Sequence, residues 1–253
     1  MKIYIPTRSR PNLTTPDILP RSLHRDVVLV VTRDERLVYQ SIWEKKFEIL
    51  ELPRRIEGLS ATRQFIMEYD KGQHVQLDDD LTGFIYKPKI GEWKMKPMSE
   101  RRILDMFDEM SNWISGTIAI ASTQDRMALA RPSSKKWRDY TRVGQVMFID
   151  GEECLDKDWR FDRVKIYADQ DMALQIIRGG GITRTSHVYG HNMRPIYAPG
   201  GVSLYRDQKV INESAKKLVE LHPGLVSLRW KEKHGYKVPS RIIQYKKARL
   251  ESC

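Results

Sequence analysis

Short apolar runs and amphipathic segments alternate along the first part of the chain. Residues 27–31 are an unbroken run of valine and leucine, which is typical of a strand covered on both faces of a sheet. Similar reasoning predicts strands at residues 2–5 and 47–52 and a helix at 37–47. The resulting order of strand, helix and strand favours an α/β architecture.

A second helix is expected to start at Gly58 and Ser60 and to lead into a strand that ends at Asp78. Beyond it, the same rules predict a helix at 99–113, strands at 117–121 and 146–149, a long polar loop at 126–142 between them, a helix opening with Asp169 and Asp171 that stops at the glycines 179–181, and a helix at 206–221.

Three consecutive carboxylates, Asp78, Asp79 and Asp80, follow the strand that ends at Asp78. Unpaired carboxylates are costly to bury, so the cluster needs a partner. In extended chain Asp78 and Asp80 point the same way, and together they could hold Mg2+ or Mn2+. Asp79 points to the other face, where we expect a structural or sugar-facing role. The alternative is an acidic turn on the surface.

A polar loop with two arginines follows the first strand. Ligands of open α/β sheets bind beyond the carboxyl ends of strands, so this loop is a candidate nucleotide-binding edge, with its arginines on phosphates. Arg63 lies in the first turn of a helix whose N-terminus already favours anions. The candidate nucleotide contacts are Pro6, Thr7, Arg8, Arg10, Arg63 and Asp79. The alternative for the loop is a solvated basic turn.

Two acidic residues at the start of a later helix, Asp169 and Asp171, are candidates for a general base. Their alternative role is to cap the helix and complement its dipole. Further on, His187 could ligate a metal that carboxylates already hold; a structural histidine is the alternative.

Composition narrows the class of protein. The 253 residues carry 44 Lys and Arg against 33 Asp and Glu, a net charge of +11, which favours a phosphate-bearing partner. No apolar run approaches the roughly 20 residues of a membrane span, and no signal peptide is visible at the N-terminus. From the lack of such a run we expect no membrane association. Only Cys154 and Cys253 are present, so we expect a reducing, cytoplasmic setting.

Basic residues interleaved with aromatic ones suggest two nucleic-acid contacts. One lies in the 126–142 loop and the other in the basic tail at 229–249; an exposed loop and solvated helices are the alternatives. The candidate DNA contacts are Lys135, Lys136, Trp137, Arg138, Arg229, Lys231, Lys233 and Lys246.

An ordered set of these segments resembles the GT-A glycosyltransferases of the family-2 type. The set is Gly58-x-x-Ala61-Thr62-Arg63-Gln64, then Leu77-Asp78-Asp79-Asp80, then Phe161-Asp162, Tyr167-Ala168-Asp169-Gln170-Asp171 and His187.

The resemblance implies a mixed, Rossmann-related sheet flanked by helices. It also implies that Asp78 and Asp80 hold a metal on the donor diphosphate, that Arg63 binds the donor, that Asp169 is the base and that His187 completes the metal shell. Two positions depart from the pattern. Gln64 replaces an asparagine, and Ala168 replaces an acidic residue, which leaves Asp169 and Asp171 both open as the base.

The opening residues 3–11, the sequence Asp-Asp-Asp-Leu and the compact size also resemble the TET-associated glycosyltransferases of bacteriophages. That resemblance implies inverting, metal-dependent transfer of a sugar from a nucleotide-sugar, expected to be a UDP-sugar, to 5-hydroxymethylcytosine in phage DNA. The location would then be the host cytoplasm. We expect a transferase domain over 1–205, with a donor-binding half at 1–115 and an acceptor half at 116–205, and a helical, basic extension over 206–253.

Three alternatives remain. The same fold could act on a glycan, lipid or protein acceptor. A nucleotidyltransferase also uses paired aspartates and a metal, but no glycine-rich phosphate loop follows the first strand. A non-catalytic nucleic-acid-binding protein would explain the charge but not the recurrence of carboxylates at strand and helix ends.

Overall fold

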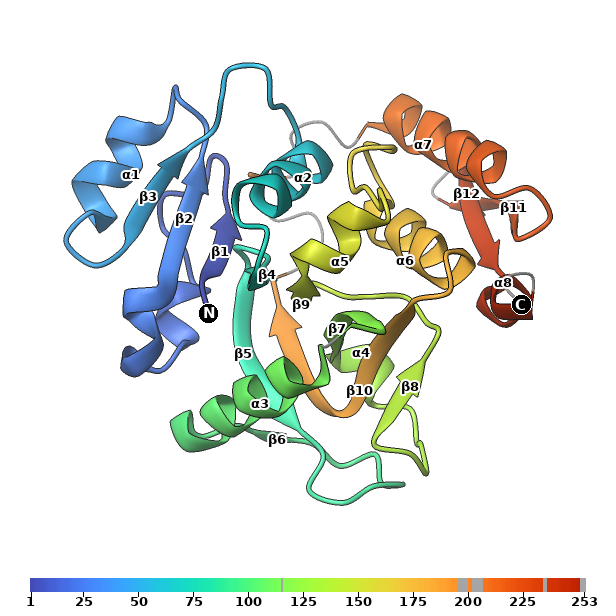
Figure 1. The fold of residues 1–253 in the computed structure, drawn as a ribbon, viewed down its shortest axis with the longest axis horizontal. Helices are drawn as coiled ribbons and strands as arrows, with labels where there is room; N and C mark the ends of the chain where they lie inside the picture. The colour runs from blue at the N-terminus through green and yellow to red at the C-terminus, as the bar shows by residue number, and fades with distance from the viewer. Residues whose placement is uncertain (115, 195–199, 202–206, 234–235, 251–253) are drawn as a thin grey trace.

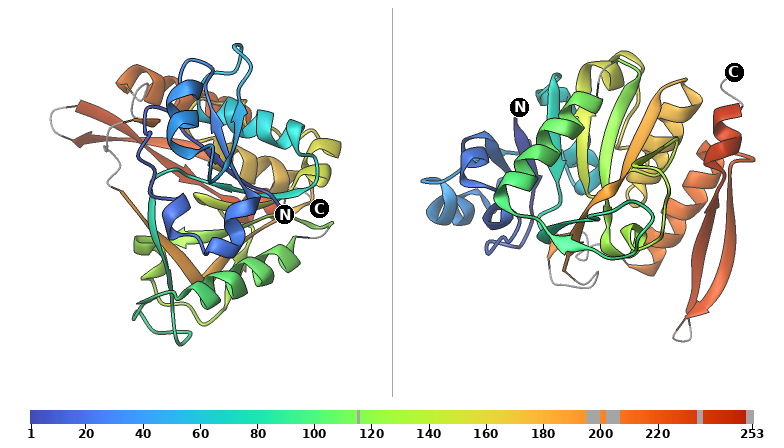
Figure 2. Two further views of the ribbon diagram at one scale, coloured as in Figure 1. Left: turned by 90° about the vertical axis from the view of Figure 1, so that its left-hand side faces the viewer. Right: turned by 90° about the horizontal axis from the view of Figure 1, so that it is seen from below.

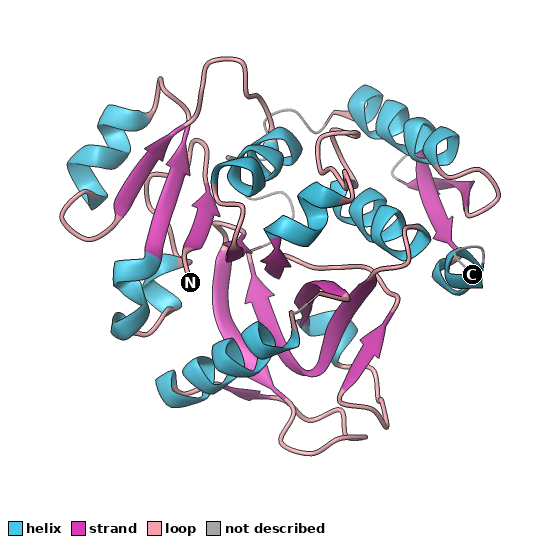
Figure 3. Cartoon of the chain, viewed as in Figure 1, coloured by secondary structure: helices cyan, strands magenta, loops and turns pink. Residues whose placement is uncertain are grey.

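The computed structural model describes residues 1–114, 116–194, 200–201, 207–233 and 236–250, and the side chains of residues 233–238 are not described. Its centre is a ten-stranded sheet in the order β3-β2-β1-β4-β9-β7-β10-β5-β6, with β8 paired to β10 (Figures 1 and 3). The strands are β1 (Ile3–Pro6), β2 (Val27–Val31), β3 (Glu48–Glu51), β4 (Gln73–Leu77), β5 (Leu81–Tyr86), β6 (Lys96–Pro97), β7 (Ile118–Asp125), β8 (Trp137–Asp139), β9 (Val146–Asp150) and β10 (Ile182–Met193).

The sheet is mixed, and its parallel part determines where loops gather. β1 is parallel to both β2 and β4, and β2 is parallel to β3. β9 is antiparallel to β4 and β7, whereas β10 is parallel to β7 and antiparallel to β5. The carboxyl ends of β1 and β4 therefore lie at one edge of the sheet, which brings the loop after Pro6 beside the turn after Leu77.

Helices cover both faces of the sheet, as the alternation of buried side chains requires. In β9, Val146 and Phe148 join the core cluster that contains α1 (Arg36–Trp43) and α3 (Glu100–Trp113). Met147 and Ile149 join the opposite cluster, which contains α5 (Gly151–Asp156) and α6 (Ala168–Arg178), together with Met67 of α2 (Leu59–Tyr69). The predicted α/β class, a mixed sheet flanked by helices, is confirmed.

The predicted elements in the first 125 residues are confirmed within a few residues, but the segment 126–142 is not the continuous loop we expected. It contains a short helix, α4 (Arg126–Leu129), and the strand β8. Two short 3-10 helices, η1 (Pro16–Ile18) and η2 (Arg21–Asp26), fill the connection from β1 to β2.

The long strand β10 was not predicted, because its buried positions are largely polar. Thr183, Thr185, Ser186 and His191 are all buried in it. The two threonine hydroxyls form hydrogen bonds inside the protein: Thr183 Oγ1 donates to Thr141 O at 2.7 Å, and Thr185 Oγ1 lies 3.1 Å from Ser122 Oγ. A hydrophobicity pattern does not register a strand that is stabilised in this way.

The C-terminal extension is only partly helical, contrary to the expectation. α7 (Gln208–Leu221) is followed by the antiparallel hairpin β11 (Val226–Lys233) and β12 (Tyr236–Ile243) and by α8 (Tyr245–Leu250). The alternation of Val226, Leu228 and Trp230 with polar residues is the strand signal that the basic charge obscured. The extension lies beside α6 (Figures 1 and 2) and shares a buried cluster with it, formed by Leu174, Ile177, Leu218, Leu225, Val226 and Ala248.

Within the described ranges, no helix has both the length and the apolar content that crossing a lipid bilayer demands.

Candidate active site

A cavity of about 770 Å3 opens at the edge of the sheet where β1 and β4 end. Several elements line it: the loop after β1, the first turn of α2, the acidic turn after β4, the start of α6, the end of β10 and one residue of β12. Among the residues predicted to bind a nucleotide or a metal or to act as a base, the lining includes Pro6, Thr7, Arg8, Arg10, Arg63, Asp78, Asp79, Asp80 and Asp169. The fold thus gathers these side chains around one space.

The first turn of α2 lines the cavity through Leu59, Ser60, Thr62 and Arg63. Gly58 precedes the helix with φ +83°, a left-handed conformation that favours glycine. Thr62 Oγ1 donates to Gly58 O at 2.9 Å, which stabilises this start. The helix N-terminus and Arg63 together form an anion-favouring wall.

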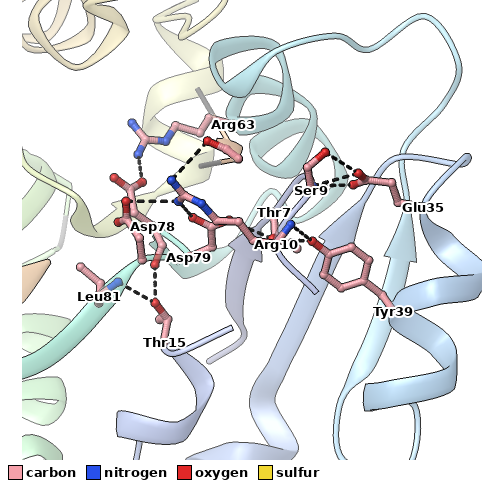
Figure 4. Close-up of polar contacts among 12 residues, drawn as sticks. Thr7, Ser9, Arg10, Thr15, Glu35, Tyr39, Arg63, Asp78, Asp79 and Leu81 are labelled. Atoms are coloured by element: carbon pink, nitrogen blue, oxygen red, sulfur yellow. Dashed lines mark hydrogen bonds and ion pairs between the residues drawn. The ribbon is translucent and has the colours of Figure 1, made fainter. Parts of the chain in front are cut away.

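The acidic turn is held by residues from α2 and from the loop after β1 (Figure 4). Arg63 Nη2 donates to Asp78 Oδ1 at 2.5 Å. Asp79 accepts from Thr7 Oγ1 at 2.8 Å and pairs with Arg10, whose Nη1 also lies 3.2 Å from Asp80 Oδ2. Asp79 is thus engaged with the loop after β1, whereas Asp78 and Asp80 keep 18% and 14% side-chain exposure.

Thr15 also stabilises this turn, and the sequence analysis did not identify this residue. Its Oγ1 donates to Asp78 O at 2.8 Å and accepts from Leu81 N at 3.0 Å (Figure 4). Thr15 is fully buried, so both ends of the turn are fixed by one hydroxyl. A lone threonine in an irregular connection carries no sequence signal for such a contact.

The triplet is electrostatically strained. Burial raises the pKa of Asp78 to about 6, against the opposing effect of Arg63, and Asp80 raises it further. Burial also raises the pKa of Asp79 and of Asp80. Among the described residues, Arg10 and Arg63 are the arginines paired with the three carboxylates, so the cluster favours an additional cation.

The residues fit a divalent ion that is shared with a ligand. Among the described side chains, no three of His, Cys, Asp and Glu come together as a metal site. However, Oδ1 of Asp80 is buried and has no hydrogen-bond partner among the residues that the structure describes, so this carboxylate oxygen is a candidate ligand for a cation. Mg2+ in particular is commonly held by one or two carboxylates, with phosphate oxygens and water completing its shell. Asp78 and Asp80 match that donor set.

The two candidate bases at the start of α6 have opposite environments. Asp169 lines the cavity, with 18% of its side chain exposed, and accepts from Arg142 Nε at 2.6 Å. Asp171 is fully buried and accepts from His222 Nε2 at 2.7 Å and from Gln175 Nε2 at 2.9 Å. Residues two apart point in nearly opposite directions on a helix, so only Asp169 faces the cavity. Sequence reasoning did not identify Arg142.

Of the two histidines in β10, His191 rather than His187 lines the cavity. The register of β10 against β7 shifts between Thr185 and Gly190, and His187 lies in that irregular part, where its N–H donates to Lys136 O at 2.7 Å. His191 is fully buried between Thr123 Oγ1 (2.6 Å from Nδ1) and Gln145 Oε1 (3.1 Å from Nε2). Burial lowers its pKa to about 4, so His191 is neutral near pH 7.

The candidate DNA contacts whose side chains are described lie on the surface, outside the cavity lining. Trp137 is 38% exposed and packs beside Arg184, whose guanidinium carbon is 4.9 Å from the Trp137 ring centre. Exposed basic side chains flank it or belong to the extension, namely Lys135, Lys136, Arg138, Arg229, Lys231 and Lys246. The side chain of Lys233 lies outside the described residues.

Comparisons with known proteins bear on this site. A family model described as TET-Associated Glycosyltransferase matches residues 1–190. A search of curated proteins found no match. One similar solved structure is that of GalNAc-T7 with UDP, GalNAc and Mn2+, with 12% sequence identity and a TM-score of 0.44. The match covers 77% of this chain and 44% of that one, so this chain corresponds to less than half of the compared structure.

Proposed function

Because this chain belongs to the TET-associated glycosyltransferase family, we propose that it transfers a sugar from a UDP-sugar to the hydroxyl of 5-hydroxymethylcytosine in phage DNA. One observation carries the proposal: the acidic turn at 78–80, the arginines and Asp169 all line one cavity. That cavity offers separate groups for a charged leaving group and for an attacking hydroxyl. The net charge of +11 supports a polyanionic acceptor.

The donor side of the proposal uses the residues that follow β1 and begin α2. Arg8, Arg10 and Arg63 and the α2 N-terminus bind the diphosphate, while Pro6 and Thr7 border the nucleoside. Asp78 and Asp80 hold a divalent ion, Mn2+ or Mg2+. When bound, this ion neutralises the negative charge on the leaving nucleoside diphosphate. We assign no ligand role to His187, and Asp79 serves to hold the loop after β1.

The acceptor side uses Asp169. Its carboxylate takes the proton of the attacking hydroxymethyl group, and Arg142, at 2.6 Å, keeps it oriented. One displacement with an aspartate base inverts the anomeric centre. A base stacked inside a duplex cannot enter a cavity of about 770 Å3, so the acceptor must be flipped out or single-stranded. In this proposal, residues 1–115 serve the donor and 116–205 the acceptor.

A labelling experiment tests the proposal. The protein is incubated with a panel of radiolabelled UDP-sugars and Mn2+, using DNA that contains either 5-hydroxymethylcytosine or cytosine. We expect label only in the hydroxymethylated DNA, and loss of label in EDTA. Asp169→Asn should lose most of the label. Asp105→Asn, on the exposed face of α3, is the matched control and should retain it. Equal or absent labelling of both DNAs would remove the DNA acceptor and return glycan, lipid or protein acceptors to consideration.

A further inference from the structure

The wall of the cavity that carries Asp169 is not built by the family region alone. The family model ends at residue 190, yet Arg241 of β12 lines the cavity together with Tyr167, Asp169 and Gln170. β12 lies beside α6 and well away from β1 (Figure 1). A residue of the C-terminal extension therefore reaches the part of the cavity opposite the donor-binding loop.

Arg241 is held in a defined orientation there. Its guanidinium carbon lies 3.5 Å from the centre of the Tyr167 ring, and its Nε donates to Gln170 Oε1 at 3.0 Å. A guanidinium this close to a ring centre and also hydrogen-bonded has little rotational freedom. Tyr167 occupies the N-cap position of α6 with φ +75°, and it packs against the cluster shared by α6 and the extension. Arg241 is thus held by Gln170 and by a ring that is itself packed in place.

A second side chain of the extension, Tyr245, packs against the same buried cluster as Tyr167. The hydroxyl of Tyr245, in α8, is buried and has no hydrogen-bond partner among the described residues. Burial raises the pKa of Tyr245, and the charge of Asp169 raises it further. An unpaired buried hydroxyl is costly.

We infer that the Arg241 guanidinium, supported by Tyr167 and Gln170, is the surface on which the acceptor base stacks. Through Arg241, the C-terminal extension would then contribute to the acceptor site. This inference rests on the proposed function. Unstacked bases bind on aromatic rings and on arginine planes, and a cationic plane also suits the adjoining phosphates. Arg241 is a binding residue in this account and takes no part in proton transfer.

Equilibrium binding separates base stacking from general charge. Two duplexes are compared by fluorescence anisotropy: one has 5-hydroxymethylcytosine opposite an abasic position, and the other has abasic positions in both strands. We expect the wild type to prefer the duplex with the base. Arg241→Lys, which keeps the charge but removes the plane, should reduce that preference about 10-fold. Arg241→Gln should do the same.

Two controls distinguish this loss from misfolding and from a charge effect. The thermal shift produced by UDP should be unchanged in Arg241→Lys, because the donor residues are on other elements. Arg101→Lys, an exposed arginine of α3 whose side chain is 86% exposed, should retain the full preference for the base.

Each outcome decides the inference. It is overturned if the wild type has no preference for the base, or if either Arg241 variant keeps the wild-type preference. It is also overturned if Arg241→Lys weakens binding of both duplexes equally. A wild type that prefers the base but transfers no sugar would contradict the proposed transfer alone. A wild type that transfers sugar while Arg241→Lys keeps its preference would contradict the stacking surface alone.

Discussion

Arg63 and Asp78 form a largely buried ion pair, with 2.5 Å between Nη2 and Oδ1 and side-chain exposures of 7% and 18%. Removing one member of such a pair leaves a charge in a site that water reaches poorly. Arg63→Met should therefore lower the free energy of unfolding at pH 7 by about 3 kcal/mol. Urea denaturation measures the change.

The matched control for this prediction is Arg101→Met. The pair of Arg101 with Asp105 is exposed, and its loss should cost less than about 1 kcal/mol. At pH 5 the effect of Arg63→Met should shrink, because burial already raises the pKa of Asp78 to about 6 and the protonated carboxyl needs no partner. Equal effects of the two substitutions would contradict the buried pair.

Asp169 and Asp171 should respond to the same substitution in opposite ways. Asp169→Asn removes the proposed base and should reduce kcat by about 100-fold or more, with stability close to wild type because its partner Arg142 is 46% exposed.

Asp171→Asn, by contrast, disturbs a fully buried group bound to His222 and Gln175. It should cost about 3 kcal/mol of stability while the folded fraction keeps its kcat. Steady-state kinetics and thermal unfolding of both variants measure the contrast. The reverse pattern would assign the base to Asp171.

His191 should make stability fall in mild acid. Burial lowers its pKa from 6.5 to about 4, so between these values the unfolded chain binds the proton more readily than the folded one. The contribution of neutral His191 to the free energy of unfolding is therefore fully present above pH 6.5. It decreases as the pH falls towards 4, by up to about 3 kcal/mol. His191→Gln should flatten this part of the profile. Identical pH profiles for wild type and variant would show that His191 is not the group responsible.

The exposed lysines before β8 should contribute to DNA affinity through charge alone. Replacing Lys135 and Lys136 by serine should weaken binding of any DNA sequence and reduce the slope of log Kd against log salt by about 2. The control is the same double change at Lys45 and Lys46, which are also exposed but lie at the end of α1, far from β8 (Figure 1). An unchanged slope in the Lys135 and Lys136 variant would exclude this segment from the DNA contact.

The donor side could be predicted from sequence because its residues follow regular strands. Apolar runs predict β1, β2 and β4, and parallel strands bring their carboxyl ends together, so the loop that carries Arg10 lies beside the turn that carries Asp79 and Asp80. Gly58 likewise predicts where α2 begins. Propensity and periodicity determine these positions locally.

The acceptor side could not be predicted in the same way. Arg142 lies in an irregular connection, and Arg241 reaches the cavity only because the hairpin packs beside α6. His187 and His191 differ through a register shift in β10 that no periodicity reveals. The sequence does not show which of Asp169 and Asp171 faces the cavity. The packing of α6 buries Asp171 and leaves the side chain of Asp169 partly exposed. Tertiary packing decides each of these cases.

Intact-mass spectrometry of an oligonucleotide with one 5-hydroxymethylcytosine tests the central claim most directly. After incubation with the wild-type protein, a panel of UDP-sugars and Mn2+, we predict one added sugar residue. We predict no addition to the same oligonucleotide with cytosine, and none to either oligonucleotide with Asp80→Ala, which removes the carboxylate oxygen that has no partner in the described part of the chain. An unmodified mass with every UDP-sugar, or an added sugar that persists in Asp80→Ala, would contradict the account.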